Sequence, residues 1–311
     1  MPALQRRIRL TQLRLLVAIS EHGSLARAAL NLHVTQPAAT KTLRQLEEAV
    51  GEQLVSRSSG GSLLTPTGEI LCKRARLILA ELMDAEQELG LWHSGGAGHV
   101  VIGALPVAAP MLIPQALKAL AVLAPRVTVE VIEGPYDSMF RELVAGKIDM
   151  LVGRAWPGEE TGVMTDVMYD STFRLNVRAG HPLSQRKRLT LKDTTAYPWI
   201  LPPPSAHTRG AIEDMLRHAG LALPTHPVET TSYLVIRSML IDSDMIAALP
   251  TEVMDAEQKQ GLIVSLPLRL DLRLPPIGIV RLSKRTPSPT VLAVIEQIKK
   301  VGGQATAIYT D

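Results

Sequence analysis

The stretch HVTQPAATKTLRQLEE, residues 33–48, decides the fold at the N-terminal end of this 311-residue chain. Thr35 is a good N-cap, and Pro37 follows in the first helical turn, where its missing N–H would be unpaired anyway. The helix is expected to run to about Val50, with Gly51 closing it. At about 100° per residue, one side of this helix carries the apolar residues Ala39, Leu43, Leu46 and Val50. The stretch therefore predicts an amphipathic helix packed on neighbouring elements.

The opposite side of this helix carries Pro37, Lys41 and Arg44, with Thr40 on the flank and Gln36 at the helix start. A solvated polar face is one interpretation of such a pattern. Contact with DNA is the other, because Lys41 and Arg44 can reach phosphates or guanine and Gln36 can bond adenine through two hydrogen bonds. The Thr40 methyl group can also pack on thymine.

The residues upstream favour DNA. A helical apolar stripe formed by Leu13, Leu16, Val17 and Ile19 stops at Gly23, and Ser24 is placed to cap a second helix, 25–32. Two short helices joined by a tight connection describe a helix-turn-helix, which docks the N-terminus of its second helix in the major groove. Residues 1–58 also hold eight Lys and Arg against four Glu, and basic patches attract polyanions.

The chain resembles the LysR-type transcriptional regulators, most densely through "LHVTQPAATKTLRQLE" followed by "LTPTGE". The resemblance continues through "HVVIGALPVAAPMLIP", "GKIDMLVGR", "AGHPL", "YPWILPPPS" and "SDMIAALP". It implies a winged helix-turn-helix whose DNA contacts fall on Gln36, Pro37, Thr40 and Lys41, and in the wing on Arg57, Thr65 and Pro66. Lys41 stands where the family more usually has Arg, which predicts a looser contact than bidentate reading of guanine. Val55, and Leu16 or Val17, stand where the family usually has aromatic residues, a difference that affects core packing.

The segment RSSGGSLLTPTG, residues 57–68, fits a β-hairpin with Gly60 and Gly61 at its turn. As a wing, this hairpin would lay Arg57 near the minor groove or the DNA backbone. A plain surface hairpin is the alternative.

From Pro66 the sequence predicts one long helix that ends at the hinge SGGAG, residues 94–98. A heptad seam runs along it through Leu71, Ala75, Ile78, Leu82, Ala85 and Leu89. Such a narrow stripe needs a partner, so we expect a second chain there and a dimer that reads a two-fold related site. Packing of the stripe on the protein's own domain is the alternative.

Beyond Gly98 strands and helices alternate, which predicts two Rossmann-like α/β lobes with mostly parallel sheets. The expected strands lie in "HVVIGAL", "VTVEVIE", "DMLVG", "FRLNVRA", "PWILP", "VETTS", "MIAAL", "LIVSL" and "IGIVRL", and the expected helices at 113–123, 138–145, 207–218, 233–241 and 291–301. The overall class is α/β, and the two lobes resemble periplasmic solute-binding proteins. The expected domains are 1–65 (winged helix-turn-helix), 66–94 (linker helix) and 95–311 (effector domain). Lobe I is expected at 99–167 and 268–311, and lobe II at 168–267.

A ligand in such a fold lies beyond the carboxyl ends of the strands, at helix N-termini. That rule selects the loop residues Leu105, Pro106, Val107, Pro204, Ser205, Thr230 and Thr231. Arg154, near the crossing between lobes, can pair with a carboxylate or serve as a structural ion-pair partner. Many relatives carry Ser or Thr where Val107 and Ala108 stand, so anion binding at that loop would rest on backbone N–H groups, and a less charged or larger effector is favoured.

The sequence also argues against several classes of protein and of site. We find no GxSxG, P-loop or HExxH motif and no GxGxxG after a strand, and the eight histidines show no metal-ligand spacing. We therefore expect no enzyme, no cofactor and no metal site. The single cysteine, Cys72, excludes an intramolecular disulfide. Without a credible membrane span or signal peptide, the protein is expected in the cytoplasm, with no membrane partner.

Two functions remain. The favoured one is a transcription regulator that binds promoter DNA and a small-molecule effector as a homo-oligomer, a dimer or, as the resemblance implies, a tetramer. The alternative is a cytoplasmic solute receptor whose first domain mediates only dimerisation. An aromatic content of 3% argues mildly against a stacking pocket for a ring compound.

Overall fold

The computed structural model describes residues 7–58, 61–94, 98–155, 162–270, 272 and 274–309. Contacts divide the chain into two compact units, one of residues 1–95 with 144–147 and one of residues 96–143 with 148–311. The predicted turn residue Gly60 and most of the predicted hinge, residues 95–97, lie outside the described residues. Within the described ranges, no helix combines the length and the apolar character needed to cross a membrane.

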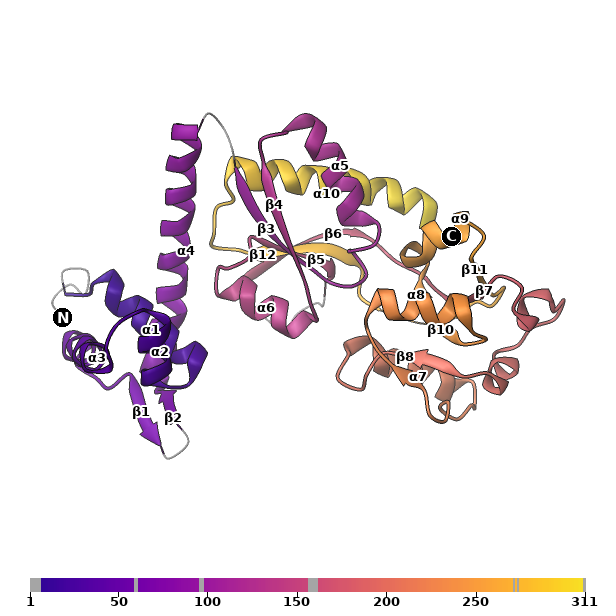
Figure 1. Ribbon diagram of the computed structural model, residues 1–311, viewed down its shortest axis with the longest axis horizontal. Coiled ribbons are helices and arrows are strands. Elements are labelled where there is room, and N and C mark those ends of the chain that lie inside the picture. The colour runs from indigo at the N-terminus through magenta and orange to yellow at the C-terminus, as the bar shows by residue number, and fades with distance from the viewer. Residues whose placement is uncertain are drawn as a thin grey trace. The chain divides into compact units, whose positions relative to one another are not determined.

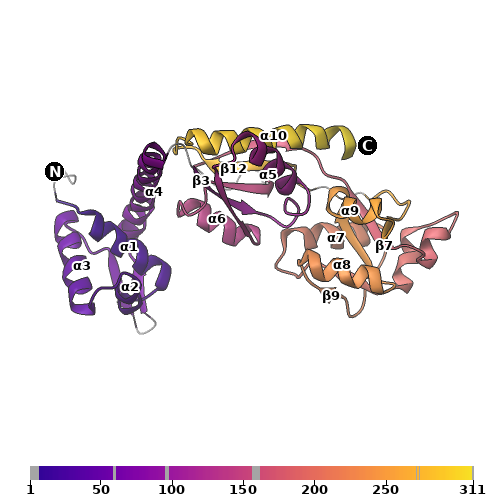
Figure 2. The same cartoon turned by 45° about the horizontal axis from the view of Figure 1, so that its top comes forward.

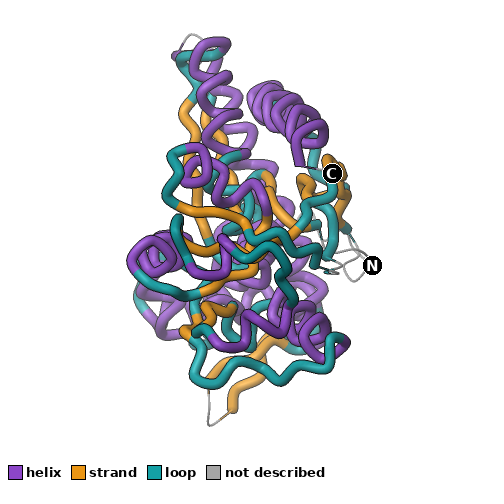
Figure 3. Tube along the Cα trace, turned by 90° about the vertical axis from the view of Figure 1, so that its right-hand side faces the viewer, coloured by secondary structure: helices purple, strands orange, loops and turns teal. Residues whose placement is uncertain are grey.

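The N-terminal unit contains three short helices, a β-hairpin and a long helix (Figure 1). Their bounds are α1 (Leu10–His22), α2 (Leu25–Asn31), α3 (Gln36–Val50), β1 (Val55–Ser58), β2 (Gly61–Leu64) and α4 (Pro66–Ser94). The three short helices share a core in which Leu16, Ile19, Ala28 and Leu46 are fully buried. The strands β1 and β2 pair antiparallel and project away from these helices (Figures 1 and 3).

The local signals in the sequence place the helix ends correctly. α1 ends at Gly23 and α3 ends at Gly51, and both glycines adopt the left-handed conformation, with φ of 62° and 86°. The Thr35 hydroxyl accepts a hydrogen bond of 3.4 Å from the N–H of Ala38, as expected of an N-cap. Ser24 stands at the N-cap of α2 but makes no capping hydrogen bond with its side chain.

Lobe I of the second unit is a five-stranded sheet of order β4-β3-β5-β12-β6. Its elements are β3 (His99–Ala104), α5 (Leu112–Leu123), β4 (Thr128–Glu133), α6 (Tyr136–Val144), β5 (Met150–Arg154), β6 (Val163–Tyr169), β12 (Ile277–Leu282) and α10 (Pro289–Tyr309). Helices α5 and α10 cover one face, where Leu112 and Val294 pack against Ile102 (Figure 2). On the other face, Gly103 leaves space that Ile148 fills beside Met139 of α6.

Lobe II is a second five-stranded sheet, of order β11-β7-β10-β8-β9. Its elements are β7 (Phe173–Arg178), η2 (Pro182–Gln185), η3 (Leu191–Ala196), β8 (Trp199–Leu201), α7 (His207–His218), β9 (Val228–Glu229), α8 (Tyr233–Asp242), β10 (Ile246–Pro250), η4 (Thr251–Met254), α9 (Asp255–Lys259) and β11 (Ile263–Ser265). Trp199 and Leu201 pack with α7 on one face, whereas Ile200 packs with α8 on the other. This alternation is what a strand buried on both faces requires.

The predicted two-lobed α/β fold is confirmed, and β12 and α10 return to lobe I as expected. The prediction of mostly parallel sheets is wrong. β12 runs antiparallel to both β5 and β6, and β7 runs antiparallel to both β10 and β11. The physical reason is the double crossing between lobes, because the strands that follow each crossing enter their sheets in the reverse direction.

Candidate DNA-binding surface and effector cavity

The outer face of α3 is free of contacts with the rest of the N-terminal unit. Gln36, Pro37, Thr40, Lys41 and Arg44 are all exposed, while Ala39, Leu43 and Leu46 are buried. The angular prediction for this helix is therefore correct. The face that remains open combines cationic, amide and methyl groups at a helix N-terminus.

Two of these side chains have local partners. The Thr40 hydroxyl donates to the carbonyl of Gln36 at 3.0 Å, so its methyl group remains available for contact. Arg44 forms an ion pair with Glu48 at 3.1 Å, one turn further along α3. Both side chains are largely exposed, and such pairs contribute only ~0.3–0.5 kcal/mol, so Arg44 can leave Glu48 for a phosphate at little cost.

The predicted wing is present as the hairpin of β1 and β2, in which Arg57 pairs with Ser62. The side chain of Arg57 lies outside the part of the chain that the structure describes. Pro66 is exposed at the start of α4. The DNA contact expected of Thr65 needs correction, because its hydroxyl donates to the carbonyl of Gln53 at 2.8 Å and accepts from the N–H of Gly68 at 3.1 Å. With its one proton already donated, this hydroxyl caps α4 and cannot donate to a phosphate.

The predicted dimer seam on α4 is shorter than expected. Ala75 is fully buried and Leu71 packs against the core of the N-terminal unit, so these two residues serve their own chain. Ile78 and Ala85 are exposed and Leu82 is half-buried, and these three still offer an apolar stripe. The side chain of Leu89 is not among those described. A heptad spacing does not distinguish the protein's own α1 from a second chain, which explains the error.

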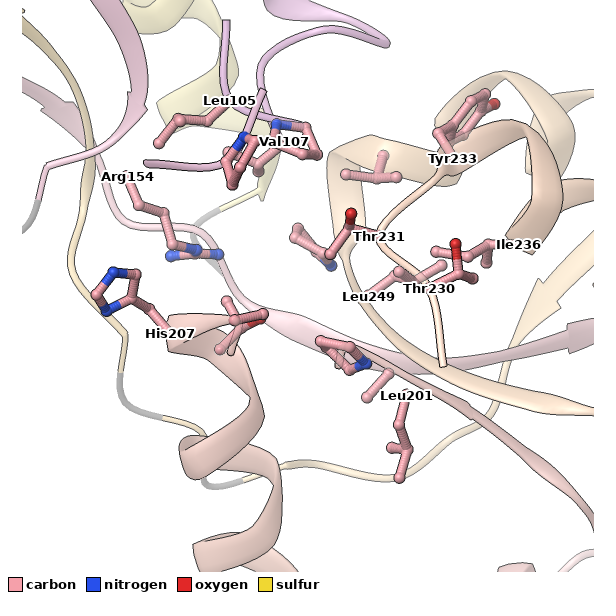
Figure 4. Close-up of a pocket in the computed structure, with 18 of the residues that line it drawn as sticks. Leu105, Val107, Arg154, Leu201, His207, Thr230, Thr231, Tyr233, Ile236 and Leu249 are labelled. Carbon is pink, nitrogen blue, oxygen red and sulfur yellow. The ribbon is translucent and has the colours of Figure 1, made fainter. Parts of the chain in front are cut away.

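Between the lobes lies a cavity of about 190 Å³ (Figure 4). Seven of the eight residues predicted for the effector line it, namely Leu105, Pro106, Val107, Arg154, Ser205, Thr230 and Thr231. Pro204 does not line it, and Ala108 is fully buried in the core of lobe I. The fold thus brings together loops from distant parts of the sequence, and the rule that ligands lie beyond the carboxyl ends of strands selected these loops.

Three helices begin at this cavity. Tyr136 opens α6, His207 opens α7 and Tyr233 opens α8, and all three residues line the space. At α7 the N-cap is Ala206, so no side chain caps the first turn there. Helix N-termini carry partial positive charge and unpaired N–H groups, so the cavity favours a negatively charged group.

Arg154 is the most deeply buried charged group of the cavity wall, with 4% of its surface exposed. Its Nη1 donates to the carbonyl of Pro275 at 2.7 Å, and its Nη2 lies 3.5 Å from the Ser171 hydroxyl. The guanidinium also lies over the ring of Phe173, 5.0 Å from its centroid. Figure 4 shows the guanidinium directed toward the space that Val107, His207 and Thr231 surround.

The electrostatics of this wall are dominated by burial. Burial lowers the pKa of Arg154 to about 10, against the opposing attraction of Glu252. The pKa of Glu252 is raised, since burial outweighs the hydrogen bond of 2.9 Å that Ser171 donates to it and the charge of Arg154. Arg154 therefore remains a cation at neutral pH.

A second polar contact, besides that of Arg154 with Ser171, joins the two lobes at the cavity. Nε2 of His207, on α7, lies 3.2 Å from Oδ1 of Asp137, on α6. The ring of Tyr136 meets His207 edge to face, with centroids 5.7 Å apart. The contact is largely exposed to solvent, so it can break without leaving a buried charge.

Comparison with known proteins identifies the family. A model described as the LysR substrate binding domain matches residues 93–303, and one described as the bacterial regulatory helix-turn-helix protein, lysR family, matches residues 10–69. The chain belongs to the LysR family. Like other LysR-type proteins it is a DNA-binding transcriptional regulator with an effector-binding domain, and not an enzyme. Membership supports this function over that of a receptor whose first domain mediates only dimerisation.

Individual LysR-type relatives agree with this assignment. The HTH-type transcriptional regulator GbpR of Rhizobium radiobacter is 33% identical over 248 residues, which cover 78% of this chain and 82% of that protein. PcaQ of Agrobacterium fabrum is 28% identical over 301 residues, covering 96% of each. The structure of full-length OxyR from Pseudomonas aeruginosa gives a TM-score of 0.66 at 23% identity, over 94% of this chain and 97% of that one. At that identity the structural match supports the fold alone.

Sequence reasoning missed four aromatic side chains in the cavity of this LysR-type protein, namely Tyr136, Phe173, His207 and Tyr233. Low aromatic content was a poor guide, because several of the few aromatic residues gather at one site. Tyr136 and Tyr233 each open a helix after a strand, so the rule that selected the other loops could have found them. Within the described residues, no group of His, Cys, Asp and Glu could hold a metal ion.

Proposed function

We propose that this LysR-type regulator reads DNA with α3 and senses an effector in the cavity between its lobes. The observation that carries the proposal is the open face of α3, where Gln36, Thr40 and Lys41 are exposed at an N-terminus that Thr35 caps. A recognition helix presents its N-terminal residues to base edges in this way. Arg44, Pro37 and the wing residues Arg57 and Pro66 would add contacts to the backbone.

The same proposal gives each part of the chain a role. Residues 1–65 would form the DNA-binding domain, 66–94 the linker and 95–311 the effector domain. Lobe I would take residues 99–167 and 268–311, and lobe II 168–267. Ile78, Leu82 and Ala85 would contribute to the contact of α4 with a second chain, and a dimer or tetramer would read a two-fold related site. We place the protein in the cytoplasm, where a bacterial promoter is accessible, and this placement rests on the DNA-binding function.

Binding of the full-length protein to DNA from its own promoter region, measured by gel shift, tests the proposal. Gln36→Ala should lose ~1–3 kcal/mol of discrimination at one base position, and Lys41→Ala should weaken binding. Lys73→Ala is the matched control, since this lysine is exposed on α4, away from α3. Equal affinity for promoter DNA and unrelated DNA would contradict the proposal. So would a loss of DNA affinity in Lys73→Ala as large as the loss in Lys41→Ala.

A further inference from the structure

Arg154 differs in its partners from Arg209, which is also buried, and from Arg281, whose side chain is 13% exposed. Arg209 contacts the carboxylates of Glu213 and Glu229 at 2.7 and 2.8 Å, and Arg281 contacts Asp166 at 3.0 Å. Within the described residues, no carboxylate lies within ion-pair distance of Arg154. Glu252 lies beyond ion-pair distance, attracts the guanidinium through space, and is joined to it by the bridging Ser171 hydroxyl.

A buried cation with no carboxylate in direct contact is unusual on physical grounds. Buried charges are normally paired, because taking a charge out of water carries a large desolvation cost. A guanidinium carries five N–H donors, and the described residues accept from Arg154 at only two places, one of them at 3.5 Å. The group thus retains donors in a fixed fork that matches a carboxylate.

The rest of the cavity wall defines the remainder of the ligand. Leu105, Val107, Phe173, Ile236 and Leu249 are among the apolar side chains that line it. An apolar cavity of ~150 Å³ takes up benzene, and this one measures about 190 Å³. The space therefore suits an apolar body of about one ring together with one small polar group.

We propose that the effector is a small organic acid whose carboxylate is bound by Arg154 and whose ring-sized apolar body fills the cavity between the lobes. This inference rests on the proposed effector role of the cavity and narrows its ligand to one chemical class. The N-terminus of α7, uncapped by any side chain, adds backbone donors to the same negative charge. Asp137, the acidic residue of the wall, is largely exposed and lies against His207, so it does not neutralise Arg154.

The test uses the full-length protein and three probes, namely benzoate, the isosteric neutral benzamide, and acetate, which lacks the apolar body. Calorimetry and thermal shift at millimolar concentration should show binding of benzoate and little or none of the other two. Arg154→Gln should weaken benzoate about tenfold to a hundredfold, and Arg154→Lys should weaken it less. Arg281→Gln removes a largely covered arginine outside the cavity and should leave benzoate binding unchanged.

Three outcomes would each overturn the proposal. Benzamide could bind as tightly as benzoate, the Arg154→Gln variant could bind benzoate as tightly as the unaltered protein, or none of the probes could bind. Promoter binding by gel shift is measured on every variant. An unfolding transition like that of the unaltered protein in the thermal-shift measurement without probe shows that a variant is folded. Retained promoter binding separates failure of the ligand class from failure of the proposed DNA-binding function. Arg154→Lys serves as the second variant should Arg154→Gln not fold.

Discussion

Arg154 at the end of β5 donates a hydrogen bond of 2.7 Å to the carbonyl oxygen of Pro275, 121 positions later, where the chain returns from lobe II to lobe I. Through Ser171 the same guanidinium meets the other crossing, between β6 and β7. One side chain of the cavity wall thus touches both connections between the lobes. A change in the position of Arg154 would therefore act directly on both segments that connect the lobes.

Ser171→Ala tests this connection. The Ser171 hydroxyl donates to Oε2 of the buried Glu252 at 2.9 Å, and its removal takes a hydrogen bond from that carboxylate. We expect a destabilisation of ~1–3 kcal/mol, seen as a lower midpoint of thermal unfolding. The matched control is Ser205→Ala, on an exposed cavity loop. Equal midpoints for the two variants would show that Ser171 has no such role.

Gly51→Ala and Gly210→Ala separate backbone strain from packing. At neither glycine does an added Cβ meet another atom within 4 Å, but Gly51 has φ of +86° whereas Gly210 lies inside α7. Alanine at position 51 should destabilise by ~1–2 kcal/mol, and alanine at position 210 should stabilise by up to ~1 kcal/mol. Opposite shifts of the thermal midpoint are expected. Shifts of the same sign would argue against this account of the α3 terminus.

Glu48→Gln should strengthen DNA binding. The substitution removes the carboxylate that pairs with Arg44 at 3.1 Å and leaves the guanidinium free for a phosphate. Gel shifts over a range of salt concentrations measure the effect, which should be largest at low salt. Each additional phosphate contact should steepen the slope of log K against log salt by about 0.9. The control is Glu81→Gln, which removes an exposed carboxylate on α4. An equal gain in DNA affinity with this variant would indicate only an effect of net charge.

The sequence predicted best those features that are set locally. Helix α7 runs from His207 to His218, as its apolar spacing indicated, and α1 and α3 end at the expected glycines. Caps and periodicity are properties of neighbouring residues, so a single sequence contains them. Six of the seven loop residues that one general rule about strand ends selected line the cavity.

The features that failed depend on pairing across long distances in the chain. Strand β6 was not predicted, because its partner β12 begins more than a hundred residues later and Met164 and Val167 are exposed along it. Ala75 was assigned to a dimer seam because its spacing cannot show that α1 already covers it. The Thr65 hydroxyl was left for DNA because its acceptor, the Gln53 carbonyl, is brought near only by the hairpin.

Asp166→Asn should make the effector domain less stable at neutral pH and less dependent on pH. Asp166 of β6 contacts Arg281 of β12 and Lys299 of α10, each at 3.0 Å. Burial alone would raise the pKa of Asp166, but the hydrogen bonds from Lys299 and Arg281 outweigh it, and the pKa lies below its ordinary value.

A depressed pKa in the folded state means that the unfolded chain binds the proton more tightly. The stabilisation is therefore present above the unfolded pKa of about 3.9 and is lost as the pH falls through the lower folded value. The thermal midpoint of Asp166→Asn should lie below that of the unaltered protein at pH 7, and the gap should close in acid. Asp214→Asn, which removes an exposed carboxylate beside Arg217, should change the midpoint little at any pH. A gap for Asp166→Asn that stays constant down to the acid limit of folding would mean that the carboxylate charge is not what joins β6, β12 and α10.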